Sequence, residues 1–146
     1  MIDFGSTPPV PAFNPPSKQH LANYRRVYKS SEERARTEAD PKDALASYIV
    51  AYDEAGVSTV VVKARDVETT FGLKITNEDV AAFCKAQGPR FIGFAGVDPH
   101  KGMDAIRELE HAIKGLGLKG LNIQCFENKI AINRSEERRV GKECRL

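Results

Sequence analysis

Long apolar segments are missing from this chain of 146 residues. No apolar run approaches the roughly 18 residues that a membrane-spanning helix needs. Residues 1–3 also do not open a basic segment followed by an apolar one, as a secretory signal does. The sequence therefore predicts no membrane partner and no signal, and we expect a cytoplasmic location.

Cysteine is scarce. Cys84, Cys125 and Cys144 are odd in number and show no CxxC spacing. Disulfide frameworks in short secreted chains need an even set, and structural zinc sites need closely spaced pairs. The pattern predicts neither, and we interpret these thiols as buried or incidental side chains.

Most of the chain carries no net charge. The formal net charge of +2 arises in residues 134–146, RSEERRVGKECRL, which hold 5 basic and 3 acidic residues. Among the 22 basic and 20 acidic residues of the chain, this leaves 17 of each sign in residues 1–133. The tail resembles the conceptual translation of a sequencing adaptor. We predict that residues 134–146 are non-native and that no nucleic acid binds, with a genuine basic tail as the alternative.

The rest of the chain has an ordinary globular composition, with 41% hydrophobic and 29% charged residues. Strand-like and helix-like segments alternate, which predicts βαβ units with a parallel sheet. Strands are expected at residues 1–4, 57–64, 91–97 and 118–124. Helices are expected from Pro41 to Gly56, at 77–87 and at 102–116.

The three expected helices each have an apolar face. The predicted core-facing residues are Leu45, Tyr48, Ile49 and Tyr52 in the first helix, Val80, Phe83 and Cys84 in the second, and Ile106, Leu109, Ile113 and Leu116 in the third. Residues 8–16 are rich in proline and predict a loop, followed by a short helix near 21–28 and an exposed connector. Loops are also predicted at 65–76 and 98–101. Four such strands fit either half of a β/α barrel or a complete small doubly wound domain.

Residues 90–123 carry a more specific signal, RFIGFAGVDPHKGMDAIRELEHAIKGLGLKGLNI. This stretch resembles the amidohydrolase-related family, which includes metal-dependent hydrolases and nonoxidative decarboxylases of aromatic and unsaturated acids. Residues 53–57, DEAGV, and the opening Ile2-Asp3 resemble it too. The resemblance implies that residues 1–133 form an α/β fold, a truncated TIM-type β/α barrel of about four units within the metal-dependent hydrolase superfamily.

The resemblance also implies a function. The parent protein is expected to be a hydrolase or carboxy-lyase that acts on a small carboxylated or cyclic molecule, and to form a homo-oligomer as one possibility. The fragment itself is expected to be inactive, because such a barrel needs about 250 residues to close. Two alternatives remain open: a catalytically inactive barrel that serves as a binding module, and the doubly wound domain.

Candidate site residues follow from the rule that a barrel's catalytic groups lie at the carboxyl ends of its strands. The predicted catalytic residues are His100, Asp98 and Asp66, and the predicted substrate-binding residues are Arg65, Lys63 and Gln124. A histidine can act as an acid or base near neutral pH, and an arginine can clamp a carboxylate. Each has a structural alternative: a surface histidine, a turn or helix cap, or an ion pair.

The family's zinc site is expected to be absent here. Members commonly carry His-x-His directly after the first strand, because two imidazoles two residues apart can share one ion. This chain has Gly5, Ser6 and Thr7 there. Members often end the fourth strand with Lys-Leu-His-Pro, and this chain has residues 122–125, NIQC. We therefore predict no metal and no other cofactor.

Overall fold

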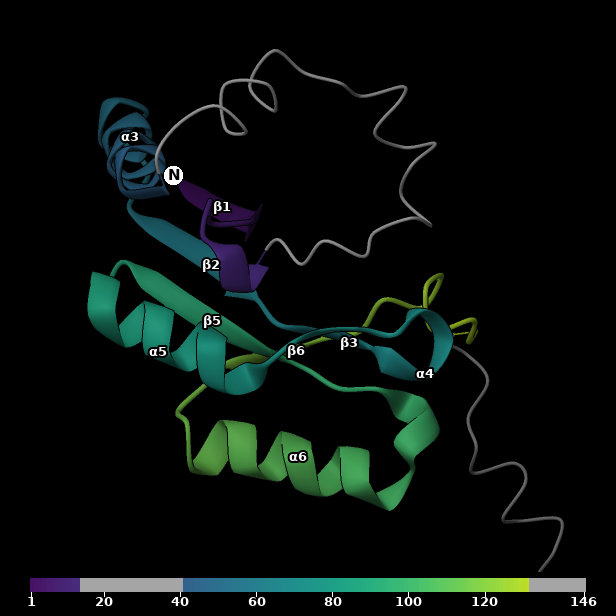
Figure 1. Cartoon of the computed structure of the whole chain (residues 1–146). Coiled ribbons are helices and arrows are strands. Elements are labelled where there is room, and N and C mark those ends of the chain that lie inside the picture. The colour runs from purple at the N-terminus through teal and green to yellow at the C-terminus, as the bar shows by residue number, and fades with distance from the viewer. Residues whose placement is uncertain (14–40, 132–146) are drawn as a thin grey trace, which may run out of the picture.

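The computed structural model describes residues 1–13 and 41–131. Figure 1 shows the strands of the main sheet running in one direction, from the side of α3 and α5 toward β3 and α4. The elements in chain order are β1 (Ile2–Ser6), η1 (Pro11–Phe13), α3 (Pro41–Glu54), β2 (Thr59–Lys63), β3 (Arg65–Val67), α4 (Glu68–Phe71), β4 (Leu73–Ile75), α5 (Asn77–Gln87), β5 (Phe91–Gly96), η3 (Pro99–Lys101), α6 (Met103–Lys114) and β6 (Gly120–Asn122).

The main sheet has the strand order β1-β2-β5-β6, and every neighbouring pair is parallel. This order follows the chain without a reversal. A doubly wound domain has a reversal, because its strand order changes direction at a switch point. The observed order is therefore that of consecutive barrel strands, with β1 and β6 at the two edges of the described sheet.

One core lies between this sheet and its helices. Val60, Val62 and Ala64 alternate along and just beyond β2, and all three are fully buried in this core. The same core takes Tyr48 from α3 and Phe83 from α5, and α6 contributes Ala112. All three long helices therefore cover one face of the sheet, as in a barrel, whereas a doubly wound sheet carries helices on both faces.

The helix predictions hold in their placement. α5 spans Asn77–Gln87, as predicted, and Thr76 caps it by accepting a hydrogen bond from the Asp79 amide at 3.1 Å. The first helix packs its predicted face, residues 45, 48, 49 and 52, against the core. The predicted short helix near 21–28 and its connector lie outside the described residues.

The predicted loop at 65–76 is wrong. It contains β3 and β4, which pair antiparallel, with the short helix α4 between them. Val67, Leu73 and Ile75 are buried there. Strands of 3 residues are too short to establish a period of two, so this unit was not recognisable from the pattern alone. Residues 98–101, also predicted as loop, include the short helix η3.

The predicted face of α6 needs a correction as well. Ala105 and Ala112 are buried, whereas Ile106 is 57% and Ile113 is 40% exposed. Leu109, as predicted, is partly buried against the core. The helix has two adjacent apolar stripes, and the sheet takes the one with alanines because small side chains let the helix backbone approach closely.

Large apolar side chains are exposed on both edge strands. Ile2 and Phe4 on β1 are 63% and 61% exposed, and Leu121 on β6 is 41% exposed. Within the described residues the sheet does not close into a barrel. No helix in residues 1–13 or 41–131 has the length and apolar character needed to cross a membrane.

Candidate functional site

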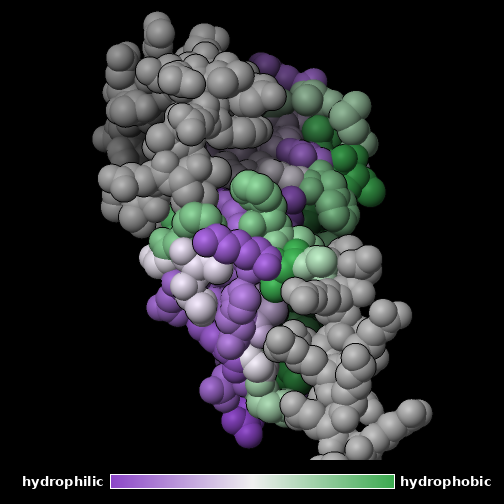
Figure 2. Space-filling model, turned by 90° about the vertical axis from the view of Figure 1, so that its right-hand side faces the viewer, coloured by the Kyte–Doolittle hydropathy of each residue, from purple (hydrophilic) through white to green (hydrophobic). Residues whose placement is uncertain are grey.

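A small cavity lies at the carboxyl ends of the parallel strands. Its volume is about 100 Å³. The polar and charged residues that line it lie in or just after three strands of the main sheet and in β3: Ser6, Thr7, Lys63, Arg65, Asn122 and Gln124. Figure 2 looks onto this end of the molecule, where hydrophilic side chains lie beside apolar ones.

The cavity thus brings together the three residues predicted to bind substrate. Lys63 ends β2, Arg65 begins β3 and Gln124 follows β6. Close packing of the backbone makes this possible: a Cβ on Gly96 would lie 2.6 Å from the carbonyl carbon of Ala64, so only glycine fits there. The end of β5 can therefore lie directly against the segment that carries Lys63 and Arg65.

Both cations of this cavity have defined neighbours. The Nζ of Lys63 lies 3.3 Å from the point that a Cβ on Gly5 would occupy. The guanidinium of Arg65 forms an ion pair with Glu127 at 3.4 Å, and the Glu127 side chain is 8% exposed. A guanidinium has five N–H donors, and this ion pair engages the nitrogen Nη1. Arg65 can therefore hold Glu127 and still donate to a second anion.

Two amides complete the polar wall. Asn122 donates from Nδ2 to the carbonyl oxygen of Ala64 at 2.9 Å. Gln124 donates from Nε2 to the Asn122 side-chain oxygen at 3.3 Å. The bond from Asn122 ties the end of β6 to the residue that follows β2, across β5, and the bond from Gln124 holds the Asn122 side chain. Asn122 lines the cavity but was not among the predicted site residues, although its position at the end of a strand is a signal in the sequence.

The residues at this end of the sheet do not fit the family's metal ion. Neither Gly5 nor Thr7 can ligate zinc as an imidazole does. The ammonium of Lys63 occupies the space beside Gly5, and a cation there disfavours a second, divalent one. Among residues 1–13 and 41–131, no group of three His, Cys, Asp or Glu side chains is placed to hold an ion. The absence of a metal from the whole protein stays a prediction.

Ser6 belongs to a cluster of hydroxyl groups between β1 and α3. Its Oγ lies 2.6 Å from the hydroxyl oxygens of both Tyr48 and Tyr52. The Tyr52 hydroxyl also donates a short hydrogen bond to Asp3. Burial raises the pKa of both phenols, so both remain protonated at neutral pH. Both tyrosines were predicted to face the core, and their spacing of four residues on one helix face indicates that their side chains are neighbours.

The three residues predicted to be catalytic do not line this cavity. Asp66 is fully buried, and its carboxylate pairs with Lys101 at 2.7 Å and Lys74 at 3.2 Å. It also accepts a hydrogen bond from the Glu68 amide at 3.1 Å. These contacts tie β3 to β4 and η3, which is the ion-pair role that the sequence left open.

Asp98 and His100 connect loops beside the cavity. The buried Asp98 carboxylate accepts from the amides of Thr69 and His100, each at 2.9 Å. Burial by itself raises the pKa of Asp98, but the hydrogen bonds from Thr69 and His100 outweigh it, so the pKa lies below its usual value. His100 is exposed, and its Nε2 lies 2.6 Å from the Asn128 carbonyl oxygen. The contacts of both residues therefore hold neighbouring loops together.

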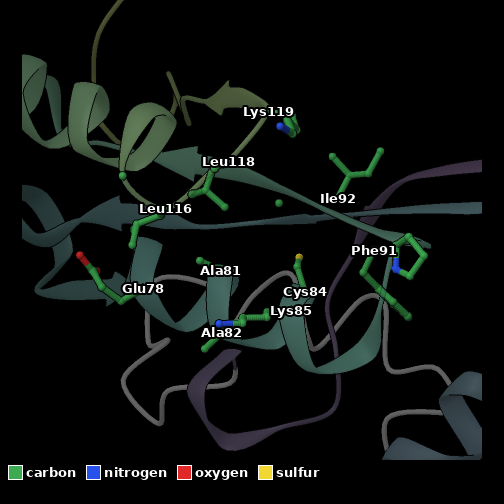
Figure 3. A pocket seen from close by; sticks show the side chains of 14 residues that line it. Glu78, Ala81, Ala82, Cys84, Lys85, Phe91, Ile92, Leu116, Leu118 and Lys119 are labelled. Atoms are coloured by element: carbon green, nitrogen blue, oxygen red, sulfur yellow. The ribbon is translucent and has the colours of Figure 1, made fainter.

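A second, larger cavity of about 770 Å³ lies at the opposite end of the strands. Figure 3 shows Cys84 from α5 and Leu118 from the segment before β6 pointing toward each other across it. A Cβ on Gly93 would lie 2.5 Å from the side chain of Leu118, so a larger residue there would displace that side chain. In β/α barrels the amino-terminal end contributes to stability, and the active site lies at the other end. The smaller cavity is therefore the candidate site.

Comparison with known proteins identifies the family of this chain. The sequence model of the family described as amidohydrolase matches residues 19–143, which is most of the chain. Neither a curated protein nor a solved structure matches it. The match covers β2, β5 and β6, whose ends form most of the cavity. The chain belongs to the amidohydrolase family.

Proposed function

We propose that this chain is part of an amidohydrolase-family enzyme that binds a small carboxylated or cyclic substrate at the cavity between Lys63, Arg65 and Gln124. Family membership supports a hydrolase-type or related function. Within that range we favour hydrolysis or nonoxidative decarboxylation, because both can use a cavity that fixes a carboxylate beside the reacting bond.

The observation that carries this proposal is the pair of cations in so small a space. Lys63 and Arg65 line a cavity of about 100 Å³ together with the amide of Gln124. That volume equals roughly three waters at about 30 Å³ each. It accommodates a carboxylate and its first carbon, and a larger substrate must extend outward. A guanidinium is suited to such a ligand, because its planar donors match the two carboxylate oxygens.

Lys63 has a second role in the proposal. Its ammonium lies beside Gly5, the position from which family members present an imidazole to their metal. A fixed positive charge can stabilise negative charge that develops on a substrate oxygen. Lys63 would supply that charge from the protein itself. No step of this proposal passes through a metal ion.

A complete active site needs more of the barrel than the described residues provide. Among the described residues no further strand pairs with β1 or β6, and both strands carry exposed apolar side chains. We propose that further strands of a longer parent protein pair with these edges, and that residues 134–146 are not native. The family match reaches residue 143 and so overlaps this tail. Sequencing the source DNA across codon 133 tests the boundary, and an uninterrupted native reading frame would contradict it.

Ligand binding by the full chain tests the proposed site. Benzoate and its neutral analogue benzamide would be titrated by calorimetry. Arg65→Gln and Lys63→Gln are each expected to weaken benzoate binding about tenfold to a hundredfold, because hydrogen bonds to charged groups contribute about 1.5–3 kcal/mol. Benzamide binding should change much less, because it carries no charge.

Lys85→Gln is the matched control for this titration. Lys85 lines the larger cavity, so its loss removes one positive charge without touching the candidate site. Benzoate affinity should stay within about twofold of the unmodified chain, since distant exposed charges are screened. Equal losses for benzoate in all three variants, or no binding by the unmodified chain, would show that the cavity is not a carboxylate site.

A second candidate function is a binding module without catalysis. The observation that favours it is the absence of imidazoles at Gly5 and Thr7, where the family's metal chemistry begins. Both proposals expect carboxylate binding at Lys63 and Arg65. They differ in turnover by the full-length parent protein, which the enzyme proposal requires and the binding-module proposal excludes.

A further inference from the structure

The parallel strands of the main sheet are staggered along their length. Ser6, the last residue of β1, pairs with Val62 of β2. Gly120, the first residue of β6, pairs with Phe94 of β5, which in turn pairs with Lys63 of β2. The strand β6 therefore begins one residue beyond the level at which β1 ends.

This stagger has the size that a closed barrel needs. β1 begins at the level of Thr59, and β6, three strands along the sheet, begins at the level of Lys63. An eight-stranded β/α barrel has a shear of about eight residues, which is about one residue per strand. The shift from β1 to β6 is close to that value. The sheet therefore matches half of such a barrel in register as well as in strand order.

Both edges of this half are available for pairing. Within residues 1–13 and 41–131, no further strand pairs with β1 or β6. If β6 of one copy pairs with β1 of another, each copy keeps one free edge until the assembly closes into a ring. A sheet of four strands needs one more copy to reach eight.

We propose that a second copy of this chain pairs with both edges, and that two copies close an eight-stranded barrel around a twofold axis. β6 of each copy lies parallel to β1 of the other, so the two contacts are identical. The cavities of both copies then lie at the same end of the barrel. This inference rests on the half-barrel of the proposed function and goes beyond it by naming a partner for the chain itself. In the longer parent protein, its own later strands would occupy the same edges.

The stagger also determines the register of the contact. Half of the barrel shear is about four residues, so the second copy is displaced by that amount along the strand direction. Ile2 of the second copy then lies beside Gly120, and Phe4 of the second copy lies beside Asn122. All of β6 therefore faces residues of the strand β1.

Side chains on the two edges fit this register. The ring of Phe94 lies 2.7 Å from the point that a Cβ on Gly120 would occupy, so Ile2 of the second copy would pack on that ring. Ile2 is 63% exposed in the single chain. On the other face of the sheet, the exposed Lys119 would lie diagonally opposite Asp3 of the second copy. Opposite charges on neighbouring strands add to the attraction.

The mass of the full chain in solution tests the closure. Sedimentation velocity at several micromolar concentrations is expected to show one main species at twice the chain mass of 16.1 kDa. Species whose mass keeps growing with concentration would mean open edge pairing and would overturn the closed dimer. A monomer at all concentrations would overturn the partner.

Disulfide cross-linking tests the register. In Phe4→Cys/Asn122→Cys, the two new cysteines of one chain lie three strand spacings or about 14 Å apart, which is too far for a bond within the chain. In the closed dimer each faces its counterpart in the other copy. Oxidation is expected to give covalent dimers without trimers or tetramers on a non-reducing gel. A ladder of longer products, or no product beyond that of the unmodified chain with its native thiols, would contradict the closed dimer.

Phe4→Cys/Leu121→Cys is the matched control for the cross-link. Leu121 is the neighbour of Asn122 on β6, and successive side chains of a strand point to opposite faces. The control is expected to form dimers at least about tenfold more slowly, because a shift of one residue moves the thiol to the other face. Equal rates for the two double variants would show association without the proposed register.

Two outcomes separate this inference from the proposed function. Benzoate binding that depends on Lys63 and Arg65, in a chain that forms no dimer, would remove the dimer and leave the carboxylate site. A closed dimer that binds no benzoate would remove the carboxylate site and leave the dimer.

Discussion

Asp98 is one buried carboxylate that holds two loops together. It accepts backbone hydrogen bonds from Thr69 at the start of α4 and from His100 in η3, and it is fully buried. A buried carboxylate that accepts two hydrogen bonds and contacts no water can be replaced by few other side chains without a loss of stability. At the scale of single residues, Asp98 and Asp66 thus stabilise the loops beside the cavity, while Lys63 and Arg65 line it.

Asp98→Asn is expected to lower the free energy of unfolding by about 1–3 kcal/mol. The NH₂ group of the new side chain would face a backbone N–H group, and two donors cannot form a hydrogen bond. Chemical denaturation would measure the change. Asp104→Asn is the control: Asp104 is exposed, and its loss should change stability by about 0.5 kcal/mol or less. Equal effects of the two substitutions would contradict the role given to Asp98.

The lowered pKa of Asp98 predicts a dependence of stability on pH. Its pKa is lower in the folded than in the unfolded protein, so its contribution is fully present above the unfolded value of about 3.9. That contribution is lost as the pH falls below about 4 toward the folded pKa. Denaturation curves from pH 7 to pH 2 should show a smaller acid loss in Asp98→Asn than in the unmodified protein. An identical acid loss would be evidence against the shift.

At the scale of secondary-structure elements, α6 shows how packing selects a helix face. Its buried positions are Ala105 and Ala112, and its exposed ones include Ile106 and Ile113. Periodicity locates both apolar stripes but cannot rank them. The choice depends on how closely the helix can approach β5, which is a property of the assembled layers.

On α6, a substitution at a buried alanine should reduce stability more than a substitution at an exposed isoleucine, although isoleucine is the more hydrophobic residue. Ala112→Leu adds volume to a fully buried position and should cost about 1–3 kcal/mol of stability. Ile113→Ala removes a larger side chain from a position that is 40% exposed and should cost less than about 1 kcal/mol. Thermal melts of both variants provide the comparison, and a larger loss for Ile113→Ala would mean that the face assignment is wrong.

At the scale of the whole molecule, we expect the two edges of the described sheet to promote self-association in solution. β1 and β6 end the described sheet, and unpaired edges with apolar side chains promote association. We expect the purified chain to self-associate at micromolar concentration. Light scattering coupled to size-exclusion chromatography would measure this. A monodisperse monomer with a cooperative melt would contradict the half-barrel proposal.

A charged residue on the β1 edge should reduce that association. Phe4 is 61% exposed on β1, and its ring packs edge to face against the ring of Phe94, with 5.3 Å between the ring centroids. Phe4→Lys is therefore expected to lower the average mass by disfavouring edge pairing. Val50→Lys is the matched control, because Val50 is 52% exposed on the helix α3 and does not belong to an edge strand. The same decrease in mass for both variants would point to general solubility and not to the edge.

Sequence alone determined the three long helices and the four parallel strands of this protein, because their signals lie within a few residues. Capping predicts the bounds of α5, periodicity predicts the buried face of α3, and the run of valines predicts β2. Residues 90–123 indicate the family. The candidate site was predictable in part: strand ends select Lys63, Arg65 and Gln124.

Tertiary structure decided the rest, because it depends on contacts between residues far apart in the chain. It alone showed that Asp66 and Asp98 are engaged by neighbouring loops, and that α6 packs its alanines inward. It also placed Ser6 within hydrogen-bond distance of Tyr48 and Tyr52, more than forty residues away. Local pattern carries no information on such distances, which arise only when the layers pack.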